Sequence, residues 1–130
     1  MKMKMKMNLD CFTGLELLRE TTAEIVRRAG EESDIETDLS VRQTAILLCV
    51  YLTPEPHTVR ALAANLNISK PAVSRAVDKL SVLGLLRRQT DETDRRSVNL
   101  YRTLTGAGYI TALGDIIEQK AKIVRNPLGL

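Results

Sequence analysis

The chain has 130 residues, of which 44% are hydrophobic and 3% aromatic, and its formal net charge is +3. This length allows one domain with a sizeable core, and a core of aliphatic residues at helical spacing predicts a mainly helical protein. The longest apolar run, from Ala45 to Leu52, is too short to cross a membrane. Cys11 and Cys49 have neither metal-site spacing nor the density of a disulfide scaffold, which favours a reducing, cytoplasmic setting.

The N-terminal third is predicted to contain a tail, a helix and a linker. Residues 1–8 alternate methionine and lysine without the apolar stretch of a signal peptide, so we expect a disordered basic tail. A helix is expected over residues 9–30, ending at Gly30, because apolar residues recur there every three or four positions. The members of this face are Phe12, Leu15, Leu18, Thr22, Ile25, Val26 and Ala29. The segment GEESDIETD carries five acids in nine residues and is predicted to be a solvated linker.

A second helix is predicted to begin at Val41, because Ser40 and Gln43 have the spacing of a capping box. The nearly continuous apolar run through Leu52 indicates a helix that is buried on most sides. The prolines of TPEPHT then end it, since proline cannot continue a helix.

Two short amphipathic helices follow, separated by about three residues. Thr58 is expected to cap the first, and Asn67 to end it in a left-handed conformation. Ser69 is expected to cap the second, with Pro71 in its first turn and Gly84 after its end. This arrangement is typical of a helix-turn-helix, whose second helix can enter a DNA groove.

The last third is predicted to hold a hairpin and a helix. The runs LLRRQT and SVNLYRT are β-capable and flank the polar turn DETDRR. A final helix is expected from about Gly106 to Arg125, within a C-terminal segment at residues 105–126. The predicted order is therefore helix, helix, helix-turn-helix, hairpin and helix, forming one structural domain.

Positive charge is concentrated in the middle of the chain. Between His57 and Arg102 there are nine basic and four acidic residues, whereas the rest has ten basic and twelve acidic residues. A polyanionic partner suits this distribution. No Gly-rich phosphate loop, metal-spaced Cys/His set or nucleophile with a nearby base is visible, and His57, the single histidine, lies beside a proline-rich turn. We therefore expect a protein that is not an enzyme and needs no cofactor or metal.

The predicted fourth helix carries the main candidate binding face. At 100° per residue, Pro71, Arg75 and Asp78 lie opposite its core residues, flanked by Ala72, Ser74 and Lys79. Arg75 could fork onto guanine or grip a phosphate, and Lys70 beside the capping Ser69 could meet phosphate oxygens. Asp78 either braces Arg75, three residues away, or lies beyond the DNA.

Three segments resemble the MarR family of bacterial winged-helix repressors: LSVRQTAILL, TVRALAANLNISKPAVSRAVDKLSVLGLLRR and TDETDRRSVNLYRT. The similarity covers roughly residues 39–106, and its most specific part is S-x-x-x-x-S-R-x-V-D-x-L-x-x-x-G-L-L-x-R followed by D-x-x-D-R-R-S-V. The family's L-T-x-x-G pattern fits either Arg102, Thr103 and Gly106 or Leu104, Thr105 and Gly108, and the ungapped register favours the first.

The resemblance implies a mainly α, α+β winged helix at residues 39–104: a helix-turn-helix plus a two-stranded β-wing. The N- and C-terminal helices would form a dimerisation layer. The implied partners are double-stranded DNA and a second copy of the chain, with one recognition helix per subunit in the major groove. In the family's D-x-R pattern, Asp94 would orient Arg96 in the minor groove while Arg95 faces phosphate. The candidate DNA-binding residues are Ser69, Lys70, Pro71, Ala72, Ser74, Arg75, Lys79, Arg95 and Arg96.

Two other functions stay open at this point. One is a winged helix that docks an acidic protein, and the other is a sensor that responds to a small molecule or an oxidant. Some relatives sense peroxides through a cysteine in the first helix, so Cys11 is a candidate thiol, against the interpretation that it is inert and packed at the helix or dimer seam. Cys49 is expected in the core, and the sequence names no effector.

Overall fold

The computed structural model describes residues 10–30 and 39–125. The predicted basic tail and most of the acidic linker lie outside these residues. The chain forms two compact units. The larger unit is Leu39–Ile110, and the smaller unit holds α1 together with the chain from Thr111 onward. Helix α5 contributes residues to both units.

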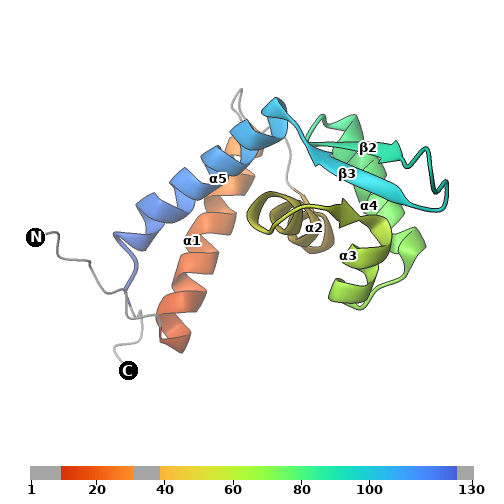
Figure 1. Cartoon of the computed structure of the whole chain (residues 1–130). Coiled ribbons are helices and arrows are strands. Elements are labelled where there is room, and N and C mark those ends of the chain that lie inside the picture. The colour runs from red at the N-terminus through yellow and green to blue at the C-terminus, as the bar shows by residue number, and fades with distance from the viewer. Residues whose placement is uncertain (1–9, 31–38, 126–130) are drawn as a thin grey trace, which may run out of the picture. The chain divides into compact units, whose positions relative to one another are not determined.

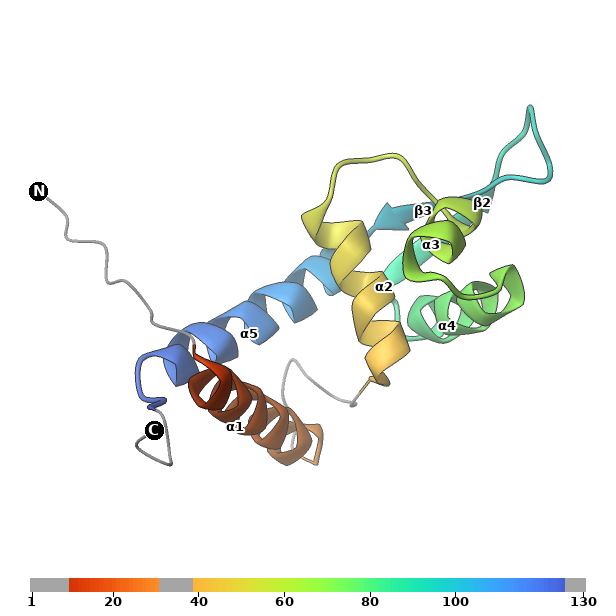
Figure 2. The ribbon, with the colours of Figure 1, turned by 90° about the horizontal axis from the view of Figure 1, so that it is seen from below.

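The larger unit has the predicted order of elements. It contains α2 (Val41–Leu52), β1 (His57–Thr58), α3 (Val59–Leu66), α4 (Lys70–Val82), β2 (Leu86–Thr90), β3 (Val98–Arg102) and the start of α5 (Leu104–Ala121). Figure 1 shows α3 and α4 beside the sheet. In both Figure 1 and Figure 2 the loop between β2 and β3 extends beyond these helices. This is the predicted winged helix-turn-helix arrangement.

The helices begin where local capping signals predicted. The Ser40 hydroxyl accepts from the Gln43 amide at 3.1 Å, and the Gln43 side chain accepts from the Ser40 amide at 2.9 Å. Thr58 accepts from the Ala61 amide at 3.0 Å and so caps α3. Asn67 ends α3 with φ 54° and ψ 46°, the left-handed conformation that asparagine tolerates better than most residues.

The sheet has one strand more than the predicted two-stranded wing. Its order is β1-β3-β2 and all pairs are antiparallel. In β1, His57 pairs with Leu100 and Thr58 with Asn99. Strand β1 has only two residues, which lie between Pro56 and α3. It is too short to show the alternation of apolar and polar residues that predicts a strand.

Helix α5 is displaced from its predicted bounds of about Gly106 to Arg125. It begins two residues earlier because the Thr103 hydroxyl accepts from the Gly106 amide at 2.9 Å and caps the first turn. It ends earlier because the amides of Lys122 and Ile123 bond three residues back, to Gln119 and Lys120, which tightens the chain out of α-helical geometry.

The core of the larger unit is aliphatic, as the composition predicted. Its side chains come from the inner faces of α2, α3, α4 and the sheet. Ile46, Leu47, Val50, Val73, Val77, Leu80 and Leu100 are at most 1% exposed. Cys49, which was also expected here, is only half-buried, and the Asn65 amide approaches its sulfur. This core holds α4 and the sheet in fixed relation to each other.

The smaller unit pairs α1 (Cys11–Ala29) with the C-terminal part of α5. Asp10 caps α1 by accepting from the Thr13 amide at 2.7 Å. Lys120 forms ion pairs with Glu20 and Glu24 at 3.4 and 3.9 Å. Among the described residues, no helix combines the length and apolar character that a membrane span needs.

Candidate nucleic-acid interface

Helix α4 has one buried and one exposed face, and the exposed face carries the predicted binding residues. Val73, Ala76, Val77 and Leu80 are buried, whereas Lys70, Pro71, Arg75 and Lys79 are exposed and Ser74 is half-buried. Arg75 lies at the centre of this face with small residues around it. A long cation surrounded by small neighbours lets a helix backbone approach a groove closely.

The first turn of α4 differs from the prediction at one position. Ala72 is only 6% exposed, so it packs into the core and is not part of the exposed face. The reason is that Ala72 and Ala76 are four residues apart on the helix and therefore lie on the same face, which packs against the core. Ser69 is exposed, and its hydroxyl caps the helix by accepting from the Ala72 amide at 3.2 Å.

Asp78 does not brace Arg75. Its carboxylate instead forms an ion pair with Arg88 of β2, and this contact joins α4 to the base of the hairpin. Among the described residues Arg75 forms no ion pair, so its guanidinium is not neutralised by the acid three residues away. The sequence could not reveal this choice, because the two arginines are three and ten residues from Asp78 and only the fold brings Arg88 close.

Arg95 and Arg96 are exposed in a turn at the tip of the hairpin, beyond the ends of both strands. The Ser97 amide donates to the Asp94 carbonyl at 2.9 Å, which places both arginines at the centre of a four-residue turn. The side-chain alternation of a strand therefore does not separate them. The Asp94 carboxylate accepts from the backbone amide of Arg96 at 3.1 Å, so it holds the main chain of Arg96.

Asp91 stabilises the other side of the same loop. Its carboxylate accepts from the hydroxyl of Thr93 at 2.7 Å and from the Thr93 amide at 2.9 Å. The bond from the Thr93 hydroxyl is the largest cause that holds the pKa of Asp91 below its usual range. The Asp91 amide in turn donates to the Ser97 carbonyl at 2.9 Å. Two of the three acids beside the arginines thus fold the turn.

A polar junction connects the hairpin with α2 and α5. The Arg102 guanidinium donates to the carbonyls of Val50 and Thr53 at 2.8 and 3.0 Å, which caps the C-terminus of α2. The Tyr51 hydroxyl donates to the Leu85 carbonyl at 2.7 Å and accepts from the Thr103 amide at 3.0 Å. Arg102 occupies the leucine position of the ungapped L-T-x-x-G register, and these two carbonyls are the partners of its charged group.

The glycine of the ungapped L-T-x-x-G register, Gly106, has no space for a side chain. A Cβ atom there would overlap the Tyr51 hydroxyl and the Leu85 carbonyl, whereas a Cβ at Gly108 would meet nothing. Close packing at Gly106 and the cap at Thr103 both support the register on Arg102, Thr103 and Gly106. Sequence reasoning identified this pattern without finding the role of Tyr51, which has no local signal.

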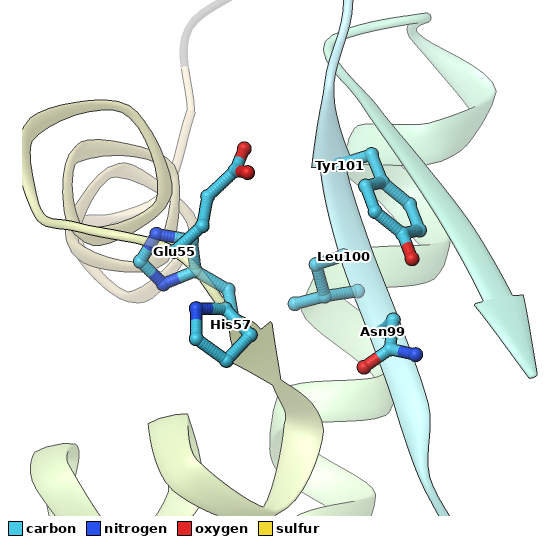
Figure 3. Close-up of a pocket in the computed structure, with 6 residues that line it drawn as sticks. Glu55, His57, Asn99, Leu100 and Tyr101 are labelled. Atoms are coloured by element: carbon cyan, nitrogen blue, oxygen red, sulfur yellow. The ribbon is translucent and has the colours of Figure 1, made fainter. Parts of the chain in front are cut away.

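A small cavity of about 170 Å³ lies between the proline-rich turn and β3. His57 lines it, but this ring is 7% exposed and its Nε2 lies 3.1 Å from the Thr53 carbonyl, so its polar atom is satisfied as expected. Figure 3 shows that the Glu55 carboxylate and the Tyr101 hydroxyl point in different directions. The labelled side chains do not converge on a common point where a reacting group could sit.

Cys11 is a free, exposed thiol at the first position of α1, so the protomer itself does not bury it. Its predicted place at a dimer seam stays a prediction. Nothing in its described surroundings identifies it as a sensor. In the described chain, no three His, Cys, Asp or Glu side chains form a group that could hold a metal ion.

The predicted apolar face of α1 is largely exposed. Leu15, Leu18 and Val26 are 58%, 59% and 63% exposed, whereas the buried residues of this helix are Thr13 and Thr21. Exposed patches of large apolar side chains in a folded chain mark interaction surfaces. Within the smaller unit, Ile117 and Ile123 are exposed as well.

Comparison with known proteins gives one family. The model of the MarR family matches residues 37–97. The fold is similar to the transcriptional regulator Tm0710 from Thermotoga maritima, with TM-score 0.66 and 24% identity over 90% of this chain and 75% of that one. For the crystal structure of MarR the TM-score is 0.63, with 24% identity over 88% of this chain and 80% of that one. For the S. aureus MepR–DNA complex it is 0.61, with 25% identity over 79% and 83%. No curated protein matches the sequence.

Proposed function

Because the chain belongs to the MarR family of transcriptional regulators, we propose that it is a homodimeric repressor that binds a pseudo-palindromic DNA operator. In this proposal α4 enters the major groove and the hairpin tip enters the adjacent minor groove. The two α4 helices of the dimer would read half-sites about 34–36 Å apart, or one turn of DNA. The MepR structure among the similar folds is a DNA complex.

The observation that carries the proposal is the unneutralised Arg75 at the centre of the exposed face of α4. The ion pair between Asp78 and Arg88 removes the nearest acid in the helix from competition for the Arg75 guanidinium. An arginine whose guanidinium is left available can donate two hydrogen bonds to the O6 and N7 atoms of guanine. Lys70 and Lys79 on the same helix would contact phosphates and fix the register without reading sequence.

The hairpin tip supports a second, minor-groove contact. Arg96 holds the position of the minor-groove arginine in the D-x-R pattern, and Asp94 fixes its backbone. A narrow A·T-rich groove has a strong negative potential that attracts such a guanidinium. Since the turn, not a strand, sets the directions of Arg95 and Arg96, we assign Arg96 to the groove and Arg95 to phosphate from the motif.

The proposed dimer would form through the apolar face of α1 and the exposed isoleucines of the smaller unit. In a two-fold interface the same surface is used by both subunits, so each exposed leucine of α1 would be covered in both of them. This burial explains why α1 presents leucines to solvent and threonines to its own unit.

The direct test selects bound duplexes from a random pool and measures affinity for the selected operator by fluorescence anisotropy at several salt concentrations. If a dimer neutralises about 6–10 phosphates, log K should fall with log[salt] by about 0.9 per contact. Arg75→Ala should cost about 1–3 kcal/mol and relax one base position. Lys70→Ala should weaken operator and scrambled DNA equally. A complex insensitive to salt would instead support docking to an acidic protein.

A further inference from the structure

A shallow hollow of about 420 Å³ lies between the first turn of α2 and the middle of α4. Val41 and Arg42 line it from α2, and Ala72, Arg75 and Ala76 line it from α4. All of these residues belong to the larger unit, so their relative positions are set by its core. The hollow therefore connects the proposed base-reading arginine to a helix outside the helix-turn-helix.

The charge at this hollow comes from its two arginines. Ser40 and Gln43 also line it, but they satisfy each other in the capping box, and Ala72 and Ala76 are buried. Arg42 and Arg75 are both exposed. No acid belongs to the lining of the hollow, and no ion pair is formed by either arginine with another described residue. Two guanidinium groups beside one hollow repel each other and favour an anion between or beside them.

We infer that Arg42 is a DNA phosphate contact, which extends the interface from α4 onto the first turn of α2. The inference rests on the proposed function, in which the operator lies against Arg75. A strand whose base edges meet Arg75 carries its phosphates past the same hollow, where Arg42 can donate two parallel hydrogen bonds to one phosphate group. Such a contact adds affinity and fixes the register without reading sequence.

The contact predicts a specific pattern for Arg42→Gln. Operator and scrambled duplex should weaken by the same factor, and the dependence of log K on log[salt] should decrease by about 0.9 per protomer, or about 1.8 for the dimer. Arg42→Lys should keep most of the wild-type slope, because the charge remains. As a matched control, Lys122→Gln removes one exposed charge from the smaller unit and should leave the slope unchanged.

The two proposals fail in different ways. If Arg42→Gln keeps the wild-type slope while Arg75→Ala still loses base discrimination, DNA binding stands and the phosphate role of Arg42 is wrong. If Arg42→Gln weakens the operator but not the scrambled duplex, Arg42 reads a base, and the inference is also overturned. If the wild-type chain binds neither duplex, the proposed function and the inference fail together. Thermal unfolding of each variant checks that the exposed substitutions leave the fold intact.

Discussion

Truncation of Leu18 tests the proposed dimer quantitatively. Leu18→Ala removes three carbon atoms, and each is worth about 0.8 kcal/mol when it is fully buried, or about 2.4 kcal/mol in total. The protomer leaves 59% of Leu18 exposed. If the dimer covers that fraction, the variant loses about 1.4 kcal/mol of association free energy per subunit. A two-fold interface contains the residue twice, so the total is about 2.8 kcal/mol, or about a 100-fold higher dimer Kd.

Sedimentation equilibrium over a concentration series measures this Kd directly. The matched control is Leu52→Ala, because Leu52 is 68% exposed, loses the same three carbons and belongs to the larger unit, whose residues form no part of the proposed interface. We expect the control to keep the wild-type Kd. The interface is wrongly placed if Leu52→Ala weakens the dimer and Leu18→Ala does not. A wild-type chain that stays monomeric at micromolar concentration and still binds DNA tightly would refute the dimer itself.

The remaining predictions concern the hairpin and the polar junction. Arg96→Ala should remove a preference for A·T pairs flanking the major-groove sites and cost about 1–3 kcal/mol in anisotropy titrations. Asp94→Ala adds net positive charge, yet it should weaken operator binding because the backbone of Arg96 loses its hydrogen bond; tighter binding would make the arginine an ordinary phosphate contact. Gly106→Ala should lower the free energy of unfolding by about 1–3 kcal/mol, because its Cβ overlaps the Tyr51 hydroxyl. In the same urea titration Gly108→Ala, which meets nothing, should raise it by about 0.5–1 kcal/mol; equal effects would contradict the packing.

The sequence by itself determined where most helices begin and end. Ser40 with Gln43, Thr58, Asn67 and Ser69 act on backbone groups within about four residues, so their effect can be predicted without a fold. Helical periodicity likewise separated most core positions of α4 from its exposed face. The order of elements and the candidate face of α4 followed from the same local signals, and the winged-helix resemblance then supplied the roles of the hairpin arginines and the dimer.

Some positions were not predicted correctly because their burial depends on contacts with residues distant in the sequence. Periodicity alone placed Ala72 at the edge of the exposed face, whereas packing buries it. The apolar repeat of α1 showed a face that must be covered, but periodicity cannot say what covers it. The described protomer leaves Leu15, Leu18 and Val26 exposed. Arg95 and Arg96 lie between the end of β2 and the start of β3, so the alternation of side chains along a strand does not predict their directions.

Only the tertiary structure decided which charged groups meet. Asp78 pairs with Arg88, ten residues away on another element, so the arginine beside it in the helix is left available. Arg102 caps α2 across about fifty residues, and Arg42 shares a hollow with Arg75 although thirty-three positions separate them. Capping bonds and helical periodicity involve residues only a few positions apart, so a short segment of sequence is enough to predict them. Ion pairs and surface hollows depend on distances in space, which the packed core of the larger unit sets.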